Sequence, residues 1–255
     1  MRLTLKLYID RFSGNMLPLN YHYELASAIY KIMSQYETEY ATWLHECGYS
    51  SNGKKQFKLF NFSDLYIPKY LINGDRMEVL SDYACWEISF LLPEGIYNFI
   101  HGVLEGQCFR VADKISGINF RITDITLAPT PELKETMRFR AISPICVSQL
   151  EPGKPPVYLS PEAIKYADAV LYGLLSRYEA AYGGPYTGKA FCGFNLLSVP
   201  KSVLITIKAN TPQQTKVRGY RYDFEITLPI ELMRLLYDCG IGEKNSMGFG
   251  MIKII

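Results

Sequence analysis

The sequence lacks several features that are typical of membrane proteins, of secreted proteins and of metal sites. No apolar run approaches the roughly 18 residues of a membrane-spanning helix. The first ten residues alternate between apolar and polar, unlike the basic start and apolar block of a secretory signal. The six cysteines are scattered without a C-x-x-C pair, which favours free thiols in a reducing compartment. We therefore expect a cytoplasmic protein with no membrane span, no bound metal and no cofactor.

An excess of one charge is also missing from the chain as a whole. The 255 residues carry a net charge of +2, and 48% of them are hydrophobic, which is typical of a globular protein and excludes disorder. Residues 1–135 hold 13 Lys and Arg against 16 Asp and Glu, or −3, whereas residues 136–255 hold 14 against 9, or +5. A polyanion would be attracted to the second half. The 20 tyrosines and 13 phenylalanines could stack on bases or simply fill a core.

The order of expected elements indicates the fold class. In the first half we expect strand 3–9, a helix capped by Asn20, a helix opened by a Ser34–Glu37 capping box and ended by Gly48, strands 57–62 and 85–92, a helix from Pro93, and strand 115–127. In the second half we expect strand 137–147, a helix capped by Ser160 that reaches about Tyr182, strands 199–209 and 219–228, a helix from Pro229 to Cys239, and strand 248–255.

Each half thus has the order β-α-β-β-α-β, which is typical of a ferredoxin-like (RRM-like) domain. The fold class is therefore α+β, with two tandem ferredoxin-like domains at residues 1–127 and 136–255. Residues 128–135 form the linker between them, where prolines favour an extended chain.

Histidine is scarce, and His45 is the one whose position suggests chemistry. His22 is expected at the surface or as a cap, and His101 in a structural role. On one continuous helix, the 15 residues between Tyr30 and His45 would separate them by roughly 22 Å. A break at Ser34 would let the second helix fold back and return His45 towards Tyr30.

A glycine-rich loop near the C-terminus is the strongest local signal. It carries four glycines at Gly240, Gly242, Gly248 and Gly250, with Lys244, Asn245 and Ser246 between them. Glycine lets a backbone approach a phosphate chain closely and expose its N–H groups, and the three polar residues add donors. The alternative is a helix end followed by an ordinary glycine-rich turn.

Basic and aromatic residues gather on the two expected strands just before this loop. They are Lys208, Lys216, Arg218, Tyr220, Arg221 and Tyr222. Strand alternation would place Lys216, Arg218, Tyr220 and Tyr222 on one face and Arg221 on the other. Cations there could contact phosphates, and tyrosines could stack on unpaired bases, so we expect this hairpin to bind RNA together with the glycine loop. The alternative is a basic hairpin that is simply solvated.

The spacing G-x-G-x5-G-x-G at Gly240–Gly250 resembles the signature of the CRISPR-associated repeat-processing endoribonucleases, which belong to the repeat-associated mysterious protein (RAMP) superfamily. The resemblance extends over most of the chain, through the segments 20–25, 29–30, 41–46, 57–63 and 142–145. It implies tandem ferredoxin-like domains and metal-independent cleavage of the repeat RNA in a CRISPR transcript.

In members with a Tyr-His-Lys site, the tyrosine and histidine positions match Tyr30 and His45, and Lys58 is the expected lysine, with Lys54 and Lys55 as alternatives. The RNA supplies its own nucleophile, the 2′-hydroxyl beside the scissile phosphate, and an imidazole can transfer a proton near neutral pH. The expected products carry a 2′,3′-cyclic phosphate and a 5′-hydroxyl.

Two other functions remain open at this point. The chain could be a non-catalytic RNA-binding subunit of the same superfamily, or a ferredoxin-like sensor or scaffold for a small ligand or protein. The expected partners are CRISPR repeat RNA and, beyond it, an interference (effector) complex, with the protein itself a monomer or a homodimer.

Overall fold

Alternating apolar residues build the central strand of the first sheet. In β1 (Arg2–Asp10), Leu3, Leu5, Leu7 and Ile9 are buried, and the residues between them face outward.

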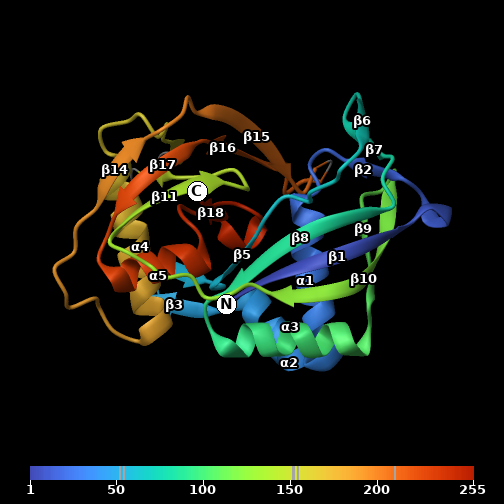
Figure 1. Cartoon of the computed structure of the whole chain (residues 1–255), viewed down its shortest axis with the longest axis horizontal. Helices are drawn as coiled ribbons and strands as arrows, with labels where there is room; N and C mark the ends of the chain where they lie inside the picture. Colours follow the sequence, from blue (N-terminus) through green and yellow to red (C-terminus); the bar gives the residue numbers. More distant parts are fainter. Residues whose placement is uncertain (52, 54, 151–152, 154, 210) are drawn as a thin grey trace.

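The computed structural model describes all residues except 52, 54, 151–152, 154 and 210, and it places two sheets side by side (Figure 1).

The first half of the chain forms a five-stranded sheet in the order β5-β8-β1-β10-β9. Its elements are β1, the 3-10 turn η1 (Arg11–Ser13), β2 (Met16–Pro18), α1 (His22–Tyr36), α2 (Thr38–Glu46), β3 (Tyr49–Ser51), β4 (Lys55–Phe57), β5 (Phe60–Phe62), β6 (Tyr70–Asn73), β7 (Arg76–Val79), β8 (Tyr83–Phe90), α3 (Pro93–Glu105), β9 (Cys108–Ala112) and β10 (Gly117–Leu127). β2, β7 and β6 form a small separate sheet, and β3 pairs with β4.

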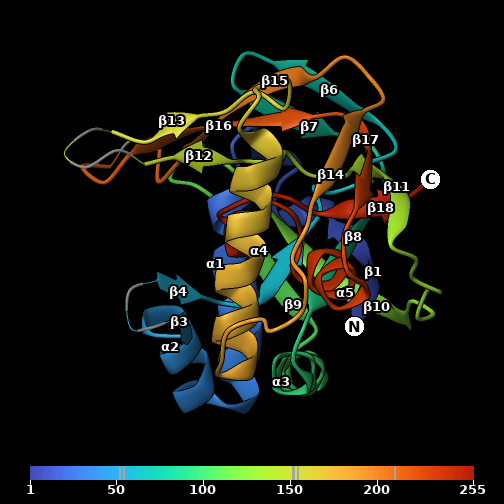
Figure 2. The ribbon, with the colours of Figure 1, turned by 90° about the vertical axis from the view of Figure 1, so that its left-hand side faces the viewer.

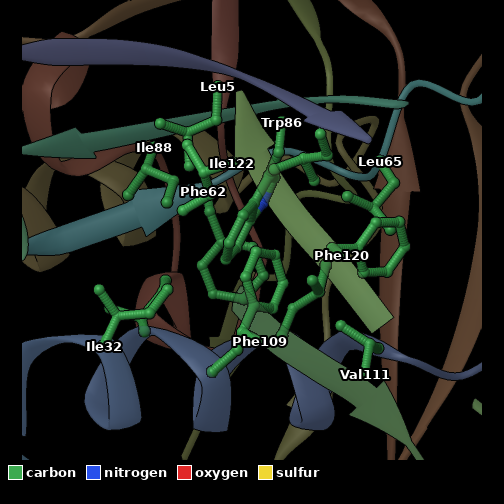
Figure 3. Packing of buried hydrophobic residues seen from close by; sticks show 14 of the residues in the cluster. Leu5, Ile32, Phe62, Leu65, Trp86, Ile88, Phe109, Val111, Phe120 and Ile122 are labelled. Carbon is green, nitrogen blue, oxygen red and sulfur yellow. The ribbon is translucent and has the colours of Figure 1, made fainter. Parts of the chain in front are cut away.

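The core of this half lies between the sheet and the helices α1 and α3. Trp86 is fully buried at its centre, with Phe62 at 5.6 Å and Phe109 at 5.8 Å between ring centroids. Ile32 of α1 closes the core from the helical side (Figure 3). Among the described residues, helices therefore cover one face of this sheet.

The second half repeats the pattern with a four-stranded sheet in the order β14-β17-β11-β18. Its elements are β11 (Thr136–Ala141), β12 (Ser148–Gln149), β13 (Val157–Tyr158), α4 (Tyr166–Tyr182), β14 (Gly193–Leu196), β15 (Lys201–Ile207), β16 (Thr215–Arg221), β17 (Asp223–Thr227), α5 (Ile230–Cys239), the 3-10 turn η2 (Asn245–Met247) and β18 (Ile252–Ile254). In both sheets the first strand of the unit lies between the third and the fourth, so the prediction of two ferredoxin-like folds is confirmed. We keep 1–127 and 136–255 as the proposed domain limits.

The strand assignment in the second half was wrong in one respect. Residues 199–209 were expected to provide the second strand of the sheet, but that strand is β14. β15 and β16 instead form a separate two-stranded ribbon, and the third strand is β17. Figure 2 shows this ribbon beside β12 and β13 at one end of α4. The ribbon is an insertion outside the four-stranded sheet. Its residues Thr206 and Arg221 contact Asn20 and Asp64 of the first half.

Three expected helix starts also differ from the structure. α1 begins after Tyr21, because the Asn20 side chain instead accepts a hydrogen bond from the Thr206 N–H at 2.9 Å. α1 runs through Ser34, and the break falls at Glu37, whose carboxylate accepts from the Glu39 N–H and caps α2. α4 begins at Tyr166, after turns that follow Ser160. Of the three helices, α2 has a side-chain cap, whereas α1 and α4 begin after Tyr21 and Lys165 without one.

The two halves are joined by buried charged groups. The Arg2 guanidinium donates to the carbonyls of Ile252 at 2.7 Å and Tyr237 at 3.0 Å, both in the second half. His22 was expected at the surface or as a cap, but it is 3% exposed, and its Nε2 lies 3.0 Å from Asp64 Oδ1. Asp64 in turn forms an ion pair with Arg221 of β16. No helix of the described residues is long and apolar enough to cross a membrane.

Candidate functional site

The break at Glu37 makes α1 and α2 a helical hairpin that brings Tyr30 and His45 together. Their ring centroids lie 4.9 Å apart, and the rings are perpendicular. Tyr30 is half-buried against Phe60, at 5.7 Å, whereas His45 is exposed in the last turn of α2. The exposed imidazole can therefore contact a ligand, whereas the Tyr30 ring packs against Phe60.

Lys58 reaches the same place from the segment between β4 and β5. Its Nζ donates to the His45 carbonyl at 2.8 Å, where the C-terminal end of α2 favours a cation. Gly48 leaves room for this side chain, since a Cβ there would lie 2.9 Å from Lys58 Cδ and 3.2 Å from Nζ. Burial lowers the pKa of Lys58, and the charge of Cys47 opposes that change.

Of the alternative lysines, Lys55 points elsewhere. Its Nζ lies 5.4 Å from the centre of the Tyr172 ring on α4. Lys54 lies outside the described residues. The structure thus places Lys58 beside His45 and directs Lys55 towards α4.

Ser246 of the glycine-rich loop completes the group of residues around Tyr30. Burial raises the pKa of the Tyr30 phenol, and a hydrogen bond with the Ser246 side chain opposes that rise. The phenol therefore stays protonated near neutral pH and can act as a hydrogen-bond donor. Because Ser246 comes from the second half, both halves contribute to this site.

The four glycines of the loop are buried and contact the protein itself. Each has a positive φ, between +78° and +85°. A Cβ on Gly250 would lie 1.9 Å from the Ile241 carbonyl oxygen, and one on Gly248 would lie 2.7 Å from the His22 ring. The N–H groups of Gly240, Gly248 and Gly250 already donate to backbone carbonyls. These positions make the glycines essential to the shape of the loop, not an exposed phosphate cradle.

The polar residues of the loop differ in exposure: Asn245 braces the loop from inside, Lys244 is exposed, and Ser246 is half-buried beside Tyr30. The Asn245 side-chain amide donates to the carbonyls of Ile241 at 3.2 Å and Phe249 at 3.0 Å, so it spans the loop from inside. Lys244 is exposed at a left-handed position, with φ +58°. Lys244 and Ser246 are therefore the side chains of the loop that a ligand can reach.

Arg177 anchors this loop and was not among the residues expected to matter. It is 2% exposed in the middle of α4, and its guanidinium donates to the Gly240 carbonyl and, at 2.7 Å, to the Gly242 carbonyl. Val170, Leu174 and Arg177 follow helical spacing on one buried face. A charged residue on an apolar helix face was the signal in the sequence that could have identified it.

The β15–β16 ribbon packs against the loop through its inner face. Ile205 and Val217 contact the buried Phe249 of the glycine-rich loop. Lys216 and Arg218 are exposed on the other face of β16, and Arg218 donates to Ser202 at 2.7 Å. The basic face and the glycine-rich loop thus belong to one packed unit.

Four aromatic or basic residues of the ribbon region have more specific positions. Lys208 lies over the Tyr23 ring of α1 at 5.6 Å. Arg221 is engaged by Asp64, as described above, and Tyr220 is half-buried. The expectation that Tyr222 shares the exposed face was wrong, because Tyr222 is 3% exposed and its hydroxyl bonds to that of Tyr166. β16 ends at Arg221, so the alternation does not continue to Tyr222.

A cavity of about 350 Å³ connects these elements. Its lining includes Lys55 and Lys58 of the first half and Tyr158, Lys244 and Ser246 of the second. Lysine and serine residues of both halves therefore line one cavity, whereas Tyr30 and His45 are not among its lining residues. Among the described residues, no three His, Cys, Asp or Glu side chains gather closely enough to hold a metal ion.

Comparison with known proteins gives consistent matches over the whole chain. A profile described as CRISPR-associated protein Cas6, N-terminal, matches residues 16–126, and one described as CRISPR associated protein Cas6, C-terminal, matches residues 128–254. CRISPR-associated endoribonuclease Cas6 1 of Methanocaldococcus jannaschii is 30% identical, over 99% of this chain and 92% of the relative.

Two solved structures extend this similarity to the fold. One, described as a Cas6-related gene from Pyrococcus furiosus, superposes with a TM-score of 0.83 at 26% identity, covering 100% of this chain and 98% of the other. A second, described as a RAMP protein binding different RNA substrates, gives a TM-score of 0.81 at 25% identity, covering 100% and 99%.

Proposed function

Because this chain belongs to the CRISPR-associated Cas6 family, we propose that it is an endoribonuclease that cleaves CRISPR precursor RNA within its repeats, to produce guide RNAs. The observation that carries this proposal is the contact between Tyr30 and His45, with the Lys58 ammonium bonded to the His45 carbonyl. A phenol, an imidazole and an ammonium group are together able to bind a phosphate and to move protons around it.

The proposed reaction is an internal displacement at phosphorus. The 2′-oxygen of the RNA forms a bond to the phosphorus while the bond from phosphorus to the 5′-oxygen breaks. The 2′-hydroxyl loses its proton, and the departing 5′-oxygen gains one. The products are a 2′,3′-cyclic phosphate and a 5′-hydroxyl, and no metal takes part in these steps.

Each of the three side chains has a part in this proposal. The exposed imidazole of His45 transfers a proton to or from the RNA. An ammonium has three donors, so Lys58 can stabilise the additional negative charge of the phosphorane while one donor remains on the His45 carbonyl. A phenol is neutral near pH 7, and burial raises the pKa of Tyr30 further, so Tyr30 orients a phosphate oxygen or the leaving oxygen by donating a hydrogen bond.

Product analysis of repeat RNA tests this function. The RNA is incubated with the protein in EDTA, and a matched RNA carries a 2′-deoxy nucleotide at the cut site. We expect cleavage of the first RNA at a rate that EDTA leaves unchanged, and none of the second. Binding without cleavage would instead identify an RNA-binding subunit, whereas activity that is lost in EDTA and restored by Mg²⁺ would contradict the mechanism.

A further inference from the structure

Three exposed tyrosines lie on the outer face of the first sheet, where the proposed site does not use them. Tyr8 is 43% exposed, Tyr83 is 41% exposed and Tyr66 is 65% exposed. Helices α1 and α3 cover the opposite face of the same sheet (Figure 1). Since Tyr30 belongs to α1, these tyrosines and the proposed cleavage site lie on opposite sides of the sheet.

The strand register places two of these rings next to each other. Tyr8 of β1 pairs directly with Tyr83 of β8 on one side and with Arg121 of β10 on the other. Directly paired residues have Cβ atoms about 5 Å apart and share one face of the sheet. A row of Tyr83, Tyr8 and Arg121 therefore crosses the three central strands. Tyr66 joins the same face through its bridge to Cys85.

A cation accompanies each of the paired rings. Lys6 Nζ lies 5.6 Å from the centre of the Tyr83 ring, and Arg121 Cζ lies 5.2 Å from the centre of the Tyr8 ring. Both cations are exposed. Each cation lies over one face of its ring, so it can contact an anion there while a flat partner stacks on the other face of the ring.

The same face is hollowed beside Tyr8. A cavity of about 460 Å³ lies there, lined by Tyr8, Arg110, Asn119 and Arg121 among others. Arg110 donates to the Asn119 side-chain carbonyl at 3.0 Å, so these two side chains are held together at the cavity. Asp10 and Asp124 are also on this face, so the surface around the rings carries both charges.

From these contacts we propose that the platform formed by Tyr8, Tyr83, Lys6 and Arg121 binds a single-stranded segment of RNA, with a base stacked on each ring and phosphates on the two cations. The proposal rests on the proposed function only in taking RNA as the ligand. Sheets of this topology bind unpaired bases through aromatic residues on their exposed face. β1 and β8, the first and third strands of the unit, are the two that provide the rings here.

This assignment gives the RNA a second binding region, away from the basic β15–β16 ribbon. RNA that occupies both the platform and the proposed cleavage site has to pass around the edge of the first sheet. The platform would therefore add affinity for single-stranded RNA that extends beyond the cleaved segment, without changing the cleavage step.

The test compares Tyr8→Ala/Tyr83→Ala with Tyr8→Phe/Tyr83→Phe, which keeps the rings. The probe is a fluorescent oligouridine of about 16 nucleotides, with an RNA duplex of the same length as a control. Loss of base stacking commonly costs about fivefold or more in affinity per base, so the alanine variant should bind oligouridine about 25-fold more weakly or worse. The phenylalanine variant and duplex binding should remain at wild-type affinity.

A second variant and a cleavage assay keep the two proposals separate. Lys6→Gln/Arg121→Gln should flatten the salt dependence of oligouridine binding, since each lost phosphate contact lowers the slope by roughly 0.7. Wild-type affinity in both the alanine and the glutamine variants would overturn the platform, as would an equal loss in the phenylalanine variant. If repeat RNA is cleaved at the wild-type rate at saturation by the alanine variant, the proposed function stands whatever the platform does. Failure of the wild-type protein to cleave it would overturn the function alone.

Discussion

The helical hairpin and the glycine-rich loop meet at one site but are built in opposite ways. His45 is exposed on a helix end, and its ring contacts Tyr30 without a hydrogen bond between them in the described structure. The loop glycines are buried and have positive φ, and a Cβ on any of them would lie less than 3 Å from a neighbouring atom. The first region can change its chemistry with little effect on folding, and the second cannot.

The difference shows what each sequence signal reports. The glycine spacing is the most recognisable pattern in the chain because a buried turn with several left-handed residues accepts almost no alternative. The histidine is harder to recognise because an exposed position accepts many residues. The strong signal therefore marks the scaffold, and the weak one marks the proposed chemistry.

The largest effect should come from His45→Ala. Loss of a general acid or base commonly lowers the rate by about 10²–10⁴. Affinity for repeat RNA and the melting temperature should stay close to wild type, because the imidazole is exposed. Single-turnover cleavage and thermal unfolding measure the two. His101→Ala on α3 is the matched control and should cleave normally, and an equal loss there would contradict the role given to His45.

A substitution in the glycine-rich loop should instead lower the stability of the fold. Gly250→Ala introduces a Cβ 1.9 Å from the Ile241 oxygen at a φ of +78°, whereas Gly74→Ala meets nothing within 4 Å at a φ of +61°. Left-handed strain alone costs about 1 kcal/mol, so Gly74→Ala should lose that amount. The added clash should bring the loss for Gly250→Ala to about 3 kcal/mol or more. Urea unfolding compares them, and equal losses would show that the loop is less constrained than its contacts indicate.

Substitutions in the β15–β16 ribbon should change the electrostatic attraction of RNA without changing the stability of the fold. Lys216→Ala/Arg218→Ala removes two exposed cations, so the slope of log affinity against log salt should fall by roughly 0.7 for each lost contact with single-stranded RNA. Lys134→Ala/Lys189→Ala removes the same charge elsewhere and should leave the slope unchanged. Parallel salt titrations of both variants decide this, and indistinguishable slopes would place the RNA away from the ribbon.

The smallest effect concerns the contact between the two halves at low pH. Burial acts to raise the pKa of Asp64, but His22 and Arg221 outweigh it, and the pKa lies below its usual value. The stability that this carboxylate contributes is present above its unfolded pKa of about 3.9, and it is lost as the pH falls through the folded value.

Asp64→Asn should therefore be less stable than wild type at about pH 6, and the difference should shrink as the pH approaches 3. Urea midpoints at several pH values measure it. A gap that stays constant with pH would indicate that the carboxylate charge is not what joins the halves.

Much of the fold could be predicted because its signals are local. The alternation of Leu3, Leu5 and Leu7 defines a strand with one buried face, and the same logic applies to most of the other strands. The β15–β16 ribbon was misassigned because its strands have the same alternation as sheet strands. Only the long-range pairing of β14 with β17 shows that the ribbon lies outside the sheet.

The site was predictable to the extent that it depends on neighbours in sequence. The return of His45 to Tyr30 requires only a helix break, although that break falls at Glu37 instead of Ser34. The burial of Tyr222, the pairing of Arg221 with Asp64 and the anchoring role of Arg177 depend on segments far apart in the chain. No periodic pattern reports such contacts.

Helix α4 contacts both of the segments that carry Lys58 and Ser246. Arg177 fixes the carbonyls of the glycine-rich loop to it, and on the same helix Glu179 accepts from Ser51 of β3, while Tyr172 lies under Lys55 of β4. The segments that carry Ser246 and Lys58 are thus both held by contacts with the same helix. A displacement of α4 would therefore move both segments together and would change the spacing between Lys58 and Ser246 less than the position of either.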